Sequence, residues 1–311
     1  MDASAIEFEG WVAVSENHAT EESWLAARRS MIGASESAAL IGEGYKDQNV
    51  ASIWLEKTRG ETREFSEAEN RRLRIGKQVE PVLRAEFEHD TGLKCMSPGP
   101  FRIFRHPNFP WLGATLDGVT YHDEFGWCPV ELKNVSEWAA SDWEDDGIPV
   151  KFEIQIQHQM AVTGASVAYL VGLIGGQRIE IRQRFRNDEA IVRLLTRNRE
   201  FWSYVESKTV PPLSDVDLAV TDVRKLFPTE NGELCYLPEE LQDIDEQLVF
   251  LKEERKRLDE QIKVFEARIE LAIGEYAMGQ LPNGVVWTHK EQHRKEYVTP
   301  AKSFRVLRRK G

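Results

Sequence analysis

An almost wholly apolar run, residues 166–176, constrains the fold more than any other feature of this 311-residue chain. The run reads SVAYLVGLIGG and is shorter than the roughly 18 apolar residues that cross a membrane. It therefore predicts a buried strand. Residues 178–185, RIEIRQRF, follow a glycine turn and alternate apolar with polar side chains, which indicates a neighbouring, half-exposed strand with a basic outer face.

Helical patterns and a hairpin surround these two strands. The segments 111–120 and 128–135 are separated by the polar turn HDEFG and predict an antiparallel pair. Thr20 and Ser35 are placed to cap two short helices, Pro81 to kink or bound a long one, and Gly92 to end it. The chain should adopt an α/β fold, with a mixed central sheet flanked by helices. Further helices are expected at 49–58, 67–91, 150–164 and 188–206.

Composition excludes several classes of protein. The net charge of −12 argues against a general nucleic-acid binder, although a single cleft can still be locally basic. The three cysteines are scattered and include no CxxC, which supports neither a disulfide framework nor a zinc or iron–sulfur site. The N-terminus lacks a signal-peptide pattern and no phosphate-binding loop occurs, so we expect a cytoplasmic protein that works without ATP and without a membrane.

The character of the chain changes after a proline-containing linker. We expect a first domain over 1–210, a linker over 211–236 and an appendage over 237–311. Apolar residues recur in steps of three and four through the appendage, interrupted by Arg255, which predicts a coiled coil with another chain or within its own. A hairpin and a basic C-terminal tail should follow. The seam comprises Leu241, Ile244, Leu248, Leu251, Leu258, Ile262, Phe265 and Ile269.

An acid and an amine stand two residues apart in the strand CPVELKNV. Glu131 and Lys133 share one face of an extended strand, while Val130 and Leu132 point toward the core. Taken alone the pair is a surface ion pair, but the hairpin can bring Asp117 of the preceding segment beside Glu131. Two neighbouring carboxylates repel unless a cation lies between them, and oxygen ligands without thiolates favour Mg²⁺ or Mn²⁺. A lysine beside such a metal suits phosphodiester hydrolysis.

Four motifs in order resemble one nuclease family. Asp117, thirteen residues, then Glu131-Leu132-Lys133 resembles the active-site pattern of the PD-(D/E)XK nucleases. RRSMIGASESAALIG, GKQVEP and QIQHQM resemble the other motifs of the phage lambda exonuclease and YqaJ-like recombination nucleases, in the same order. The resemblance implies a restriction-endonuclease-like core with a C-terminal coiled-coil and hairpin appendage.

The resemblance also assigns roles by position. Asp117, Glu131 and the carbonyl of Leu132 would bind metal, and Lys133 would be the catalytic lysine. Glu80 matches an acid near the metals and Gln155 a glutamine that positions water, although each by itself is an ordinary surface side chain. Arg28 and Ser35 match positions that hold the 5′-phosphate of a DNA end; a serine at a helix start and an arginine both suit an anion.

These features predict a Mg²⁺-dependent, ATP-independent 5′→3′ exonuclease on linear double-stranded DNA that leaves 3′ overhangs. By resemblance it would be phage- or prophage-encoded in a bacterial host, supply those strands to a single-strand annealing recombinase protein, and form a homo-oligomer, a trimer in the family. Two alternatives remain at this stage. One is a PD-(D/E)XK endonuclease of restriction or repair type, and the other is a non-catalytic DNA-binding assembly protein.

Overall fold

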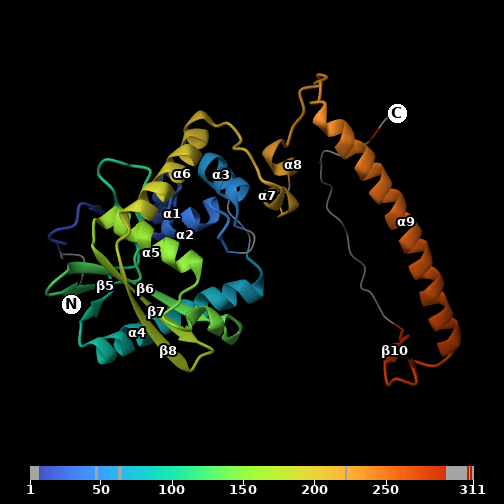
Figure 1. Cartoon of the computed structure of the whole chain (residues 1–311), viewed down its shortest axis with the longest axis horizontal. Coiled ribbons are helices and arrows are strands. Elements are labelled where there is room, and N and C mark those ends of the chain that lie inside the picture. Colours follow the sequence, from blue (N-terminus) through green and yellow to red (C-terminus); the bar gives the residue numbers. More distant parts are fainter. Residues whose placement is uncertain are drawn as a thin grey trace. The chain divides into compact units, whose positions relative to one another are not determined.

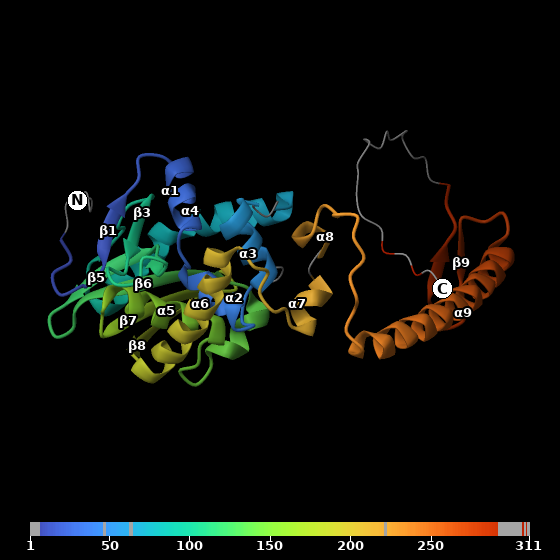
Figure 2. The same ribbon diagram turned by 90° about the horizontal axis from the view of Figure 1, so that it is seen from above.

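The computed structural model describes residues 7–45, 48–61, 65–220, 223–291, 307 and 309. The chain forms two compact units, Met1–Leu226 and Phe227–Gly311. The first unit contains the central sheet and nearly all buried side chains, and the second contains one long helix and a small hairpin (Figures 1 and 2).

A five-stranded mixed sheet forms the centre of the first unit, in the order β2-β5-β6-β7-β8. Strands β6 and β7 are parallel and the other pairs are antiparallel, as a mixed sheet requires. The apolar run at 166–176 provides β7, the buried strand next to the sheet's edge, and the predicted hairpin forms β5 and β6. The bounds are β2 Cys95–Met96, β5 Gly118–His122, β6 Gly126–Val135, β7 Val167–Ile174 and β8 Arg178–Phe185.

Helices cover both faces of this sheet. Helix α4, Glu67–Thr91, packs Leu83 and Phe87 against the face formed by Val130, Leu132 and Val171. Helix α5, Val150–Thr163, lies on the opposite face, where its apolar residues meet alternate residues of β7. Because neighbouring residues of β6 point to opposite faces, the packing of Val130 and Leu132 under α4 turns Glu131 and Lys133 toward α5.

A second layer of helices and a small sheet complete the first unit. Strands β1, β3 and β4 form an antiparallel three-stranded sheet beside α1, and α2, α3 and α6 pack with α5 around the larger hydrophobic core. The 3₁₀ helix η2, Glu137–Trp143, joins β6 to the α5 region. The remaining bounds are β1 Val14–Asn17, α1 Glu21–Arg29, α2 Ala34–Leu40, α3 Val50–Arg59, β3 Arg102–Arg105, β4 Gly113–Ala114 and α6 Asp188–Ser207.

Two local predictions from the sequence were wrong. The helix predicted at 67–91 is confirmed as α4, ended by Gly92, but the alternative of a boundary at Pro81 was wrong because the helix continues through it. A capping box at Ser66, Gly92 in the left-handed conformation and the buried residues beyond the proline stabilise it. Ser35 does not cap α2. Gly33 is the N-cap residue, and its N–H donates to the carboxylate of Glu36.

The first unit extends beyond the predicted domain end at 210. Two short helices, α7 Asp215–Val220 and α8 Val223–Leu226, lie in what the sequence indicates is a linker. Leu226 is buried in the larger core, and the Arg59 guanidinium donates to the carbonyl oxygens of Lys225 and Leu226. These contacts attach residues up to 226 to the first unit.

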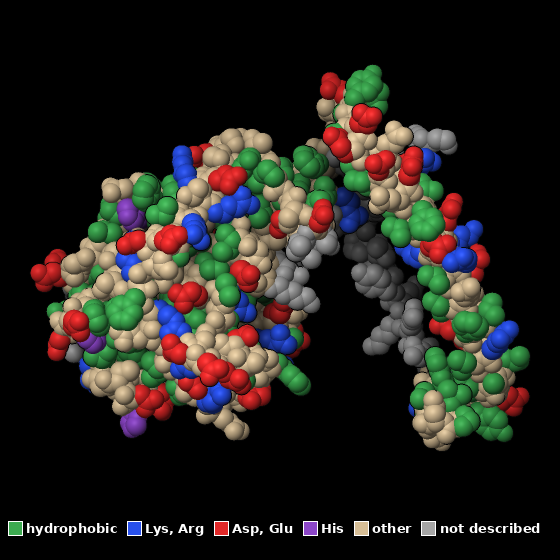
Figure 3. Space-filling view, viewed as in Figure 1, with side chains coloured by type: hydrophobic (Ala, Val, Ile, Leu, Met, Phe, Trp, Pro, Cys, Tyr) green, Lys and Arg blue, Asp and Glu red, His purple; other side chains and the backbone are tan. Residues whose placement is uncertain are grey.

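The second unit contains the predicted long helix, α9, Glu240–Ile273. Seven of the seam residues, from Leu241 to Phe265, are between 38% and 61% exposed, and Figure 3 shows hydrophobic side chains along α9. A hairpin of β9 Met278–Gln280 and β10 Val286–Thr288 follows, as predicted. The basic tail lies outside the described residues except at two positions, where Leu307 is exposed and Arg309 pairs with Asp245 at 3.0 Å. The pairing partner of the seam stays a prediction.

No helix among the described residues is both long enough and apolar enough to cross a membrane.

Candidate active site

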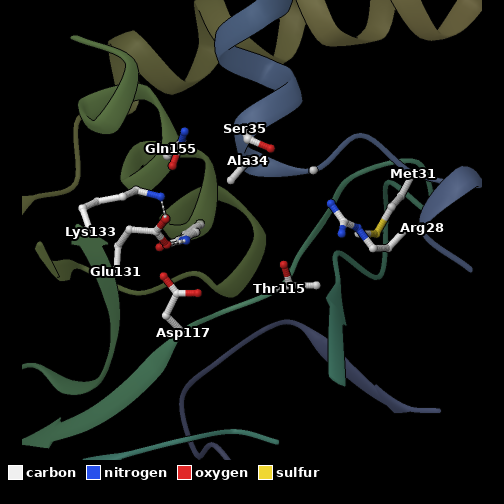
Figure 4. Close-up of a pocket in the computed structure, with 11 residues that line it drawn as sticks. Arg28, Met31, Ala34, Ser35, Thr115, Asp117, Glu131, Lys133 and Gln155 are labelled. Atoms are coloured by element: carbon white, nitrogen blue, oxygen red, sulfur yellow. Dashed lines mark hydrogen bonds and ion pairs between the residues drawn. The ribbon is translucent and has the colours of Figure 1, made fainter. Parts of the chain in front are cut away.

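Six of the eight predicted site residues line one pocket of the first unit. They come from different elements: Arg28 from the last turn of α1, Ser35 from the start of α2, Asp117 from the bend before β5, Glu131 and Lys133 from β6, and Gln155 from α5. In Figure 4, Asp117, Glu131 and Lys133 lie on one side of the pocket and Arg28 on the other, with Thr115 between Asp117 and Arg28 and with Ser35 on α2 above them. The structure therefore brings these six residues together, and their roles stay predictions.

The carboxylates of Asp117 and Glu131 form the buried side of the pocket. The backbone N–H of Leu132 donates to Asp117 Oδ2 at 3.0 Å, which fixes the carboxylate next to β6. Glu131 is only 5% exposed and its carboxylate accepts from Gln159 Nε2 at 2.5 Å. Burial and, to a lesser degree, the charge of Glu131 raise the pKa of Asp117 well above its usual range. The two acids thus repel each other in the absence of a further cation.

Lys133 supplies the positive charge beside these acids. Its ammonium group forms an ion pair with Glu131 and lies 5.2 Å from the centroid of the Phe152 ring. Burial alone would lower the pKa of Lys133, but Glu131 and, less strongly, Tyr45 and Asp117 outweigh it, so the pKa lies above its ordinary value. The side chain is therefore charged at neutral pH and can stabilise negative charge more readily than it can accept a proton.

Helix α5 presents two buried amides to the same pocket. Gln155 is only 1% exposed, so it is not the surface amide that its residue type alone suggests. Its Nε2 lies 3.5 Å from the Tyr45 hydroxyl. Gln159, one turn further along, holds Glu131, and its Oε1 is buried without a hydrogen-bond partner among the described residues. Sequence reasoning had not named Gln159 as a site residue, although the spacing of four residues places both amides on one helix face.

The other two predicted site residues, Leu132 and Glu80, do not line the pocket but lie next to it. Leu132 packs its side chain into the core and contributes its backbone N–H at the site, where that group donates to Asp117. Glu80 lies on α4, 3.8 Å from Arg84, which in turn donates to the carbonyl oxygen of Asp117 at 3.0 Å. Burial raises the pKa of Glu80, and the charge of Glu131 adds to this effect. Glu80 is thus coupled electrostatically to the acids, although it does not line the pocket.

The basic face of β8 is engaged by acidic side chains. Arg182 pairs with Glu180 at 2.7 Å and with Asp146 at 3.3 Å, and Arg184 pairs with Asp146 and Glu153 at 3.2 and 3.4 Å. The sequence left open whether these arginines line a path for a duplex or form a solvated strand face. The ion pairs argue against a duplex path at Arg182 and Arg184, and these side chains, 12% and 18% exposed, are not a solvated face either.

Known proteins resemble both the sequence and the fold. Residues 23–166 match the model of the YqaJ-like viral recombinase domain. The protein named "Uncharacterized protein YqaJ" of Bacillus subtilis (strain 168) is 27% identical over 268 residues, covering 85% of this chain and 82% of the relative. That alignment is longer than the first unit, which ends at Leu226, so it reaches into the second.

Among solved structures, LHK-Exo in complex with dAMP is 25% identical, with a TM-score of 0.50 over 60% of this chain and 93% of that chain. A second crystal structure, of the alkaline exonuclease LHK-Exo from Laribacter hongkongensis, shares 25% identity over the same proportions with a TM-score of 0.49. The domain match, the 25% identity to LHK-Exo in complex with dAMP, and the acid and lysine pocket on a mixed sheet together support a nuclease similar to lambda exonuclease. More narrowly, residues 23–166 match the YqaJ-like viral recombinase domain, the family that the sequence motifs resemble.

Proposed function

We propose that this chain is a divalent-metal-dependent, ATP-independent exonuclease that degrades the 5′-ended strand of linear double-stranded DNA. One observation carries the proposal: Asp117, Glu131 and Lys133 share a pocket with Arg28 and Ser35. The first three residues suit hydrolysis of a phosphodiester, and the last two suit a terminal phosphate. The related LHK-Exo was crystallised with dAMP, a nucleoside monophosphate, which is the kind of product that an exonuclease releases.

The residues of the pocket fit a divalent cation. Glu131 is buried and Asp117 half-buried, the two carboxylates repel each other, and the backbone carbonyl of Leu132 would add a third oxygen ligand. Among the described residues no group of three His, Cys, Asp or Glu side chains could hold a metal, so the proposed ligands are these two side chains and that carbonyl. Hard oxygen donors favour Mg²⁺, or Mn²⁺ in its place. When bound, such an ion polarises a phosphate oxygen and makes water a stronger nucleophile.

The chain's own residues then account for the chemistry. Water attacks the phosphorus of the phosphodiester, the bond from phosphorus to the 3′ oxygen breaks, and that oxygen takes up a proton. The Lys133 ammonium offsets negative charge on the phosphate as it reacts, and the Gln155 amide orients the water. The products are a 5′-mononucleotide and a strand with a new 5′-phosphate, so every cycle regenerates the group that Arg28 and Ser35 would bind.

The wider biological role is also part of the proposal. A 3′ overhang is the substrate of a single-strand annealing recombinase, which would be the partner of this phage-type nuclease. The exposed seam of α9 supports a homo-oligomer, because a row of apolar side chains at heptad spacing is stabilised by a second helix. Oligomerisation would keep the enzyme on its DNA strand without ATP.

Digestion of matched linear and covalently closed duplexes tests the enzyme class. We expect loss of the linear DNA in Mg²⁺, no cleavage in EDTA, and an intact closed circle, because the pocket requires an end. Lys133→Met should abolish activity, whereas Lys94→Met, which removes an exposed lysine that pairs with Glu88 at 3.0 Å, should not. Cleavage of the closed circle would favour the endonuclease, and binding without cleavage would favour the non-catalytic protein.

A further inference from the structure

A buried ion pair lies behind the Arg28 and Ser35 wall of the pocket. The Lys57 side chain, on α3, has no exposed surface, and its Nζ lies 2.7 Å from Glu36 Oε1. Glu36 lies on α2 and is 4% exposed. Neither residue lines the pocket, and no step of the proposed reaction uses either of them. Burying two charges is costly unless each is fully hydrogen-bonded, so their other partners show what the pair does.

Those partners connect the two segments that carry Arg28 and Ser35. Lys57 Nζ also donates to the carbonyl oxygen of Arg28 at 3.0 Å, which lies in the last turn of α1. The other oxygen of the Glu36 carboxylate accepts from the Gly33 N–H at 2.7 Å, at the start of α2. One buried pair therefore ties the end of α1 to the beginning of α2, across the short turn at 30–33.

The surroundings of Glu36 favour its ionised form. Burial alone would raise the pKa of Glu36, but the charges of Lys57 and Arg28 and the hydrogen bond from Gly33 outweigh it, so the pKa lies below its ordinary value. The Arg28 guanidinium also lies over the Trp24 ring, with its central carbon 4.7 Å from the centroid of that ring. The position of Arg28 is thus determined by its own helix and by the pair behind it.

We propose that Lys57, together with Glu36, is a positioning pair that sets the distance between Arg28 and Ser35 and thereby determines how strongly the enzyme prefers a 5′-phosphate to a 5′-hydroxyl end. The inference rests on the proposed function, because it assumes that these two residues receive the end of the strand. A bidentate arginine requires accurate placement, and an error of about 1 Å can reduce a rate about a hundredfold. Losing the pair should therefore affect phosphorylated ends far more than hydroxyl ends.

The test compares the wild-type chain with the double variant Lys57→Met, Glu36→Leu. Replacing both charges with apolar side chains of similar size leaves neither Lys57 nor Glu36 unpaired in the core. Glu56, whose Oε1 lies 3.9 Å from Lys57 Nζ, is 36% exposed and stays in contact with water, so the fold should persist. The single variant Lys57→Met leaves Glu36 unpaired, and we expect it to be less stable than the double variant. Val171→Ala is the matched control, because it destabilises the sheet face away from the pocket.

Two readouts separate a positioning role from a merely structural one. The first is the ratio of degradation rates for 5′-phosphate and 5′-hydroxyl duplexes, and the second is the ratio of dissociation constants for the same ends in Ca²⁺, measured by fluorescence anisotropy. We expect both ratios to fall about tenfold or more in the double variant, while Val171→Ala lowers the melting temperature and leaves the ratios unchanged.

A double variant that keeps the wild-type ratios would overturn the positioning role and leave the proposed function intact. A wild-type chain that degrades both ends equally and binds them equally would overturn the assignment of Arg28 and Ser35, and the positioning role with it.

Discussion

His158 provides a direct test of how the pocket walls are held together. Its ring is fully buried on α5, where Nε2 lies 2.9 Å from the carbonyl oxygen of Gly113 and Nδ1 lies 2.6 Å from Ser37 Oγ. Asn198 Nδ2 donates to the same serine at 2.5 Å. A neutral ring satisfies this arrangement, with Nε2 donating to the carbonyl and Nδ1 accepting from the hydroxyl, so α5, α2 and β4 are joined through one uncharged histidine.

The pH dependence of stability follows from this burial. Burial lowers the pKa of His158 to about 4, and the hydrogen bond to Gly113 offsets only part of the effect. An unfolded histidine takes up its proton near pH 6.5, so the unfolded state gains protons first as the pH falls. The stability associated with His158 is complete above about pH 6.5 and is lost as the pH falls toward 4. Each pH unit between the unfolded and folded pKa values corresponds to about 1.4 kcal/mol, so the total loss is about 3 kcal/mol.

Urea unfolding followed by tryptophan fluorescence at pH 8, 6 and 5 would measure this dependence. We expect the difference in free energy of unfolding between the wild type and His158→Gln to decrease by about 2 kcal/mol from pH 8 to pH 5, because only the wild type carries the titrating ring. The exposed His89 is the control, and His89→Gln should show no such decrease. A difference between the wild type and His158→Gln that does not change with pH would refute the account of a buried neutral ring.

Three further predictions concern the acids, the sheet and the long helix. Asp117→Asn should raise the melting temperature measured without metal at pH 8, because burial and the charge of Glu131 penalise the charged carboxylate. The same variant should lose the stabilisation that Mg²⁺ gives the wild type. A lower melting temperature of the variant without metal would contradict the first expectation. Gly172→Ala should lower the free energy of unfolding in urea by about 1–3 kcal/mol, because the new Cβ would lie 2.4 Å from a ring carbon of Trp143. An unchanged urea midpoint would argue against this packing. Leu248→Glu should reduce the solution mass measured by light scattering, whereas an oligomer that persists unchanged would exclude the seam as its contact.

Alternation and motif order were sufficient to predict that Asp117, Glu131 and Lys133 lie together in one pocket. Apolar residues on both sides of Glu131 fixed the buried face of β6, and the hairpin brought Asp117 close to the Leu132 backbone. These features depend on interactions between neighbouring strands with a short connection. The pattern of a single sequence contains this information because the side-chain period of a strand is two residues.

Interactions between distant elements were not predictable in the same way. Lys57 and Glu36 belong to different helices, and nothing in either helical pattern indicates that two charged side chains meet in the core. Asp146 likewise neutralises Arg182 and Arg184 from a separate segment. Periodicity indicates which face of an element is buried but not which polar groups meet there, because that depends on tertiary packing.

Helix α4 shows a local signal overridden by its context. Proline in a helix removes one hydrogen bond and costs about 3 kcal/mol, which is why Pro81 suggests a kink or a boundary. The helix nevertheless continues for ten further residues to Thr91, where Leu83 and Phe87 are buried against the sheet. Burial of these two side chains recovers a comparable free energy, at about 1.5–3 kcal/mol for each.

The first product released from a 5′-labelled linear duplex would test the central claim most directly. The account predicts that a 5′-³²P label appears at once as a mononucleotide in Mg²⁺, before a label on the 3′ end of the same strand is released, and that Lys133→Met prevents the release. Retention of the 5′ label in long fragments, or its appearance only after the 3′ label, would contradict the assignment of Arg28 and Ser35 as the site of the 5′ end.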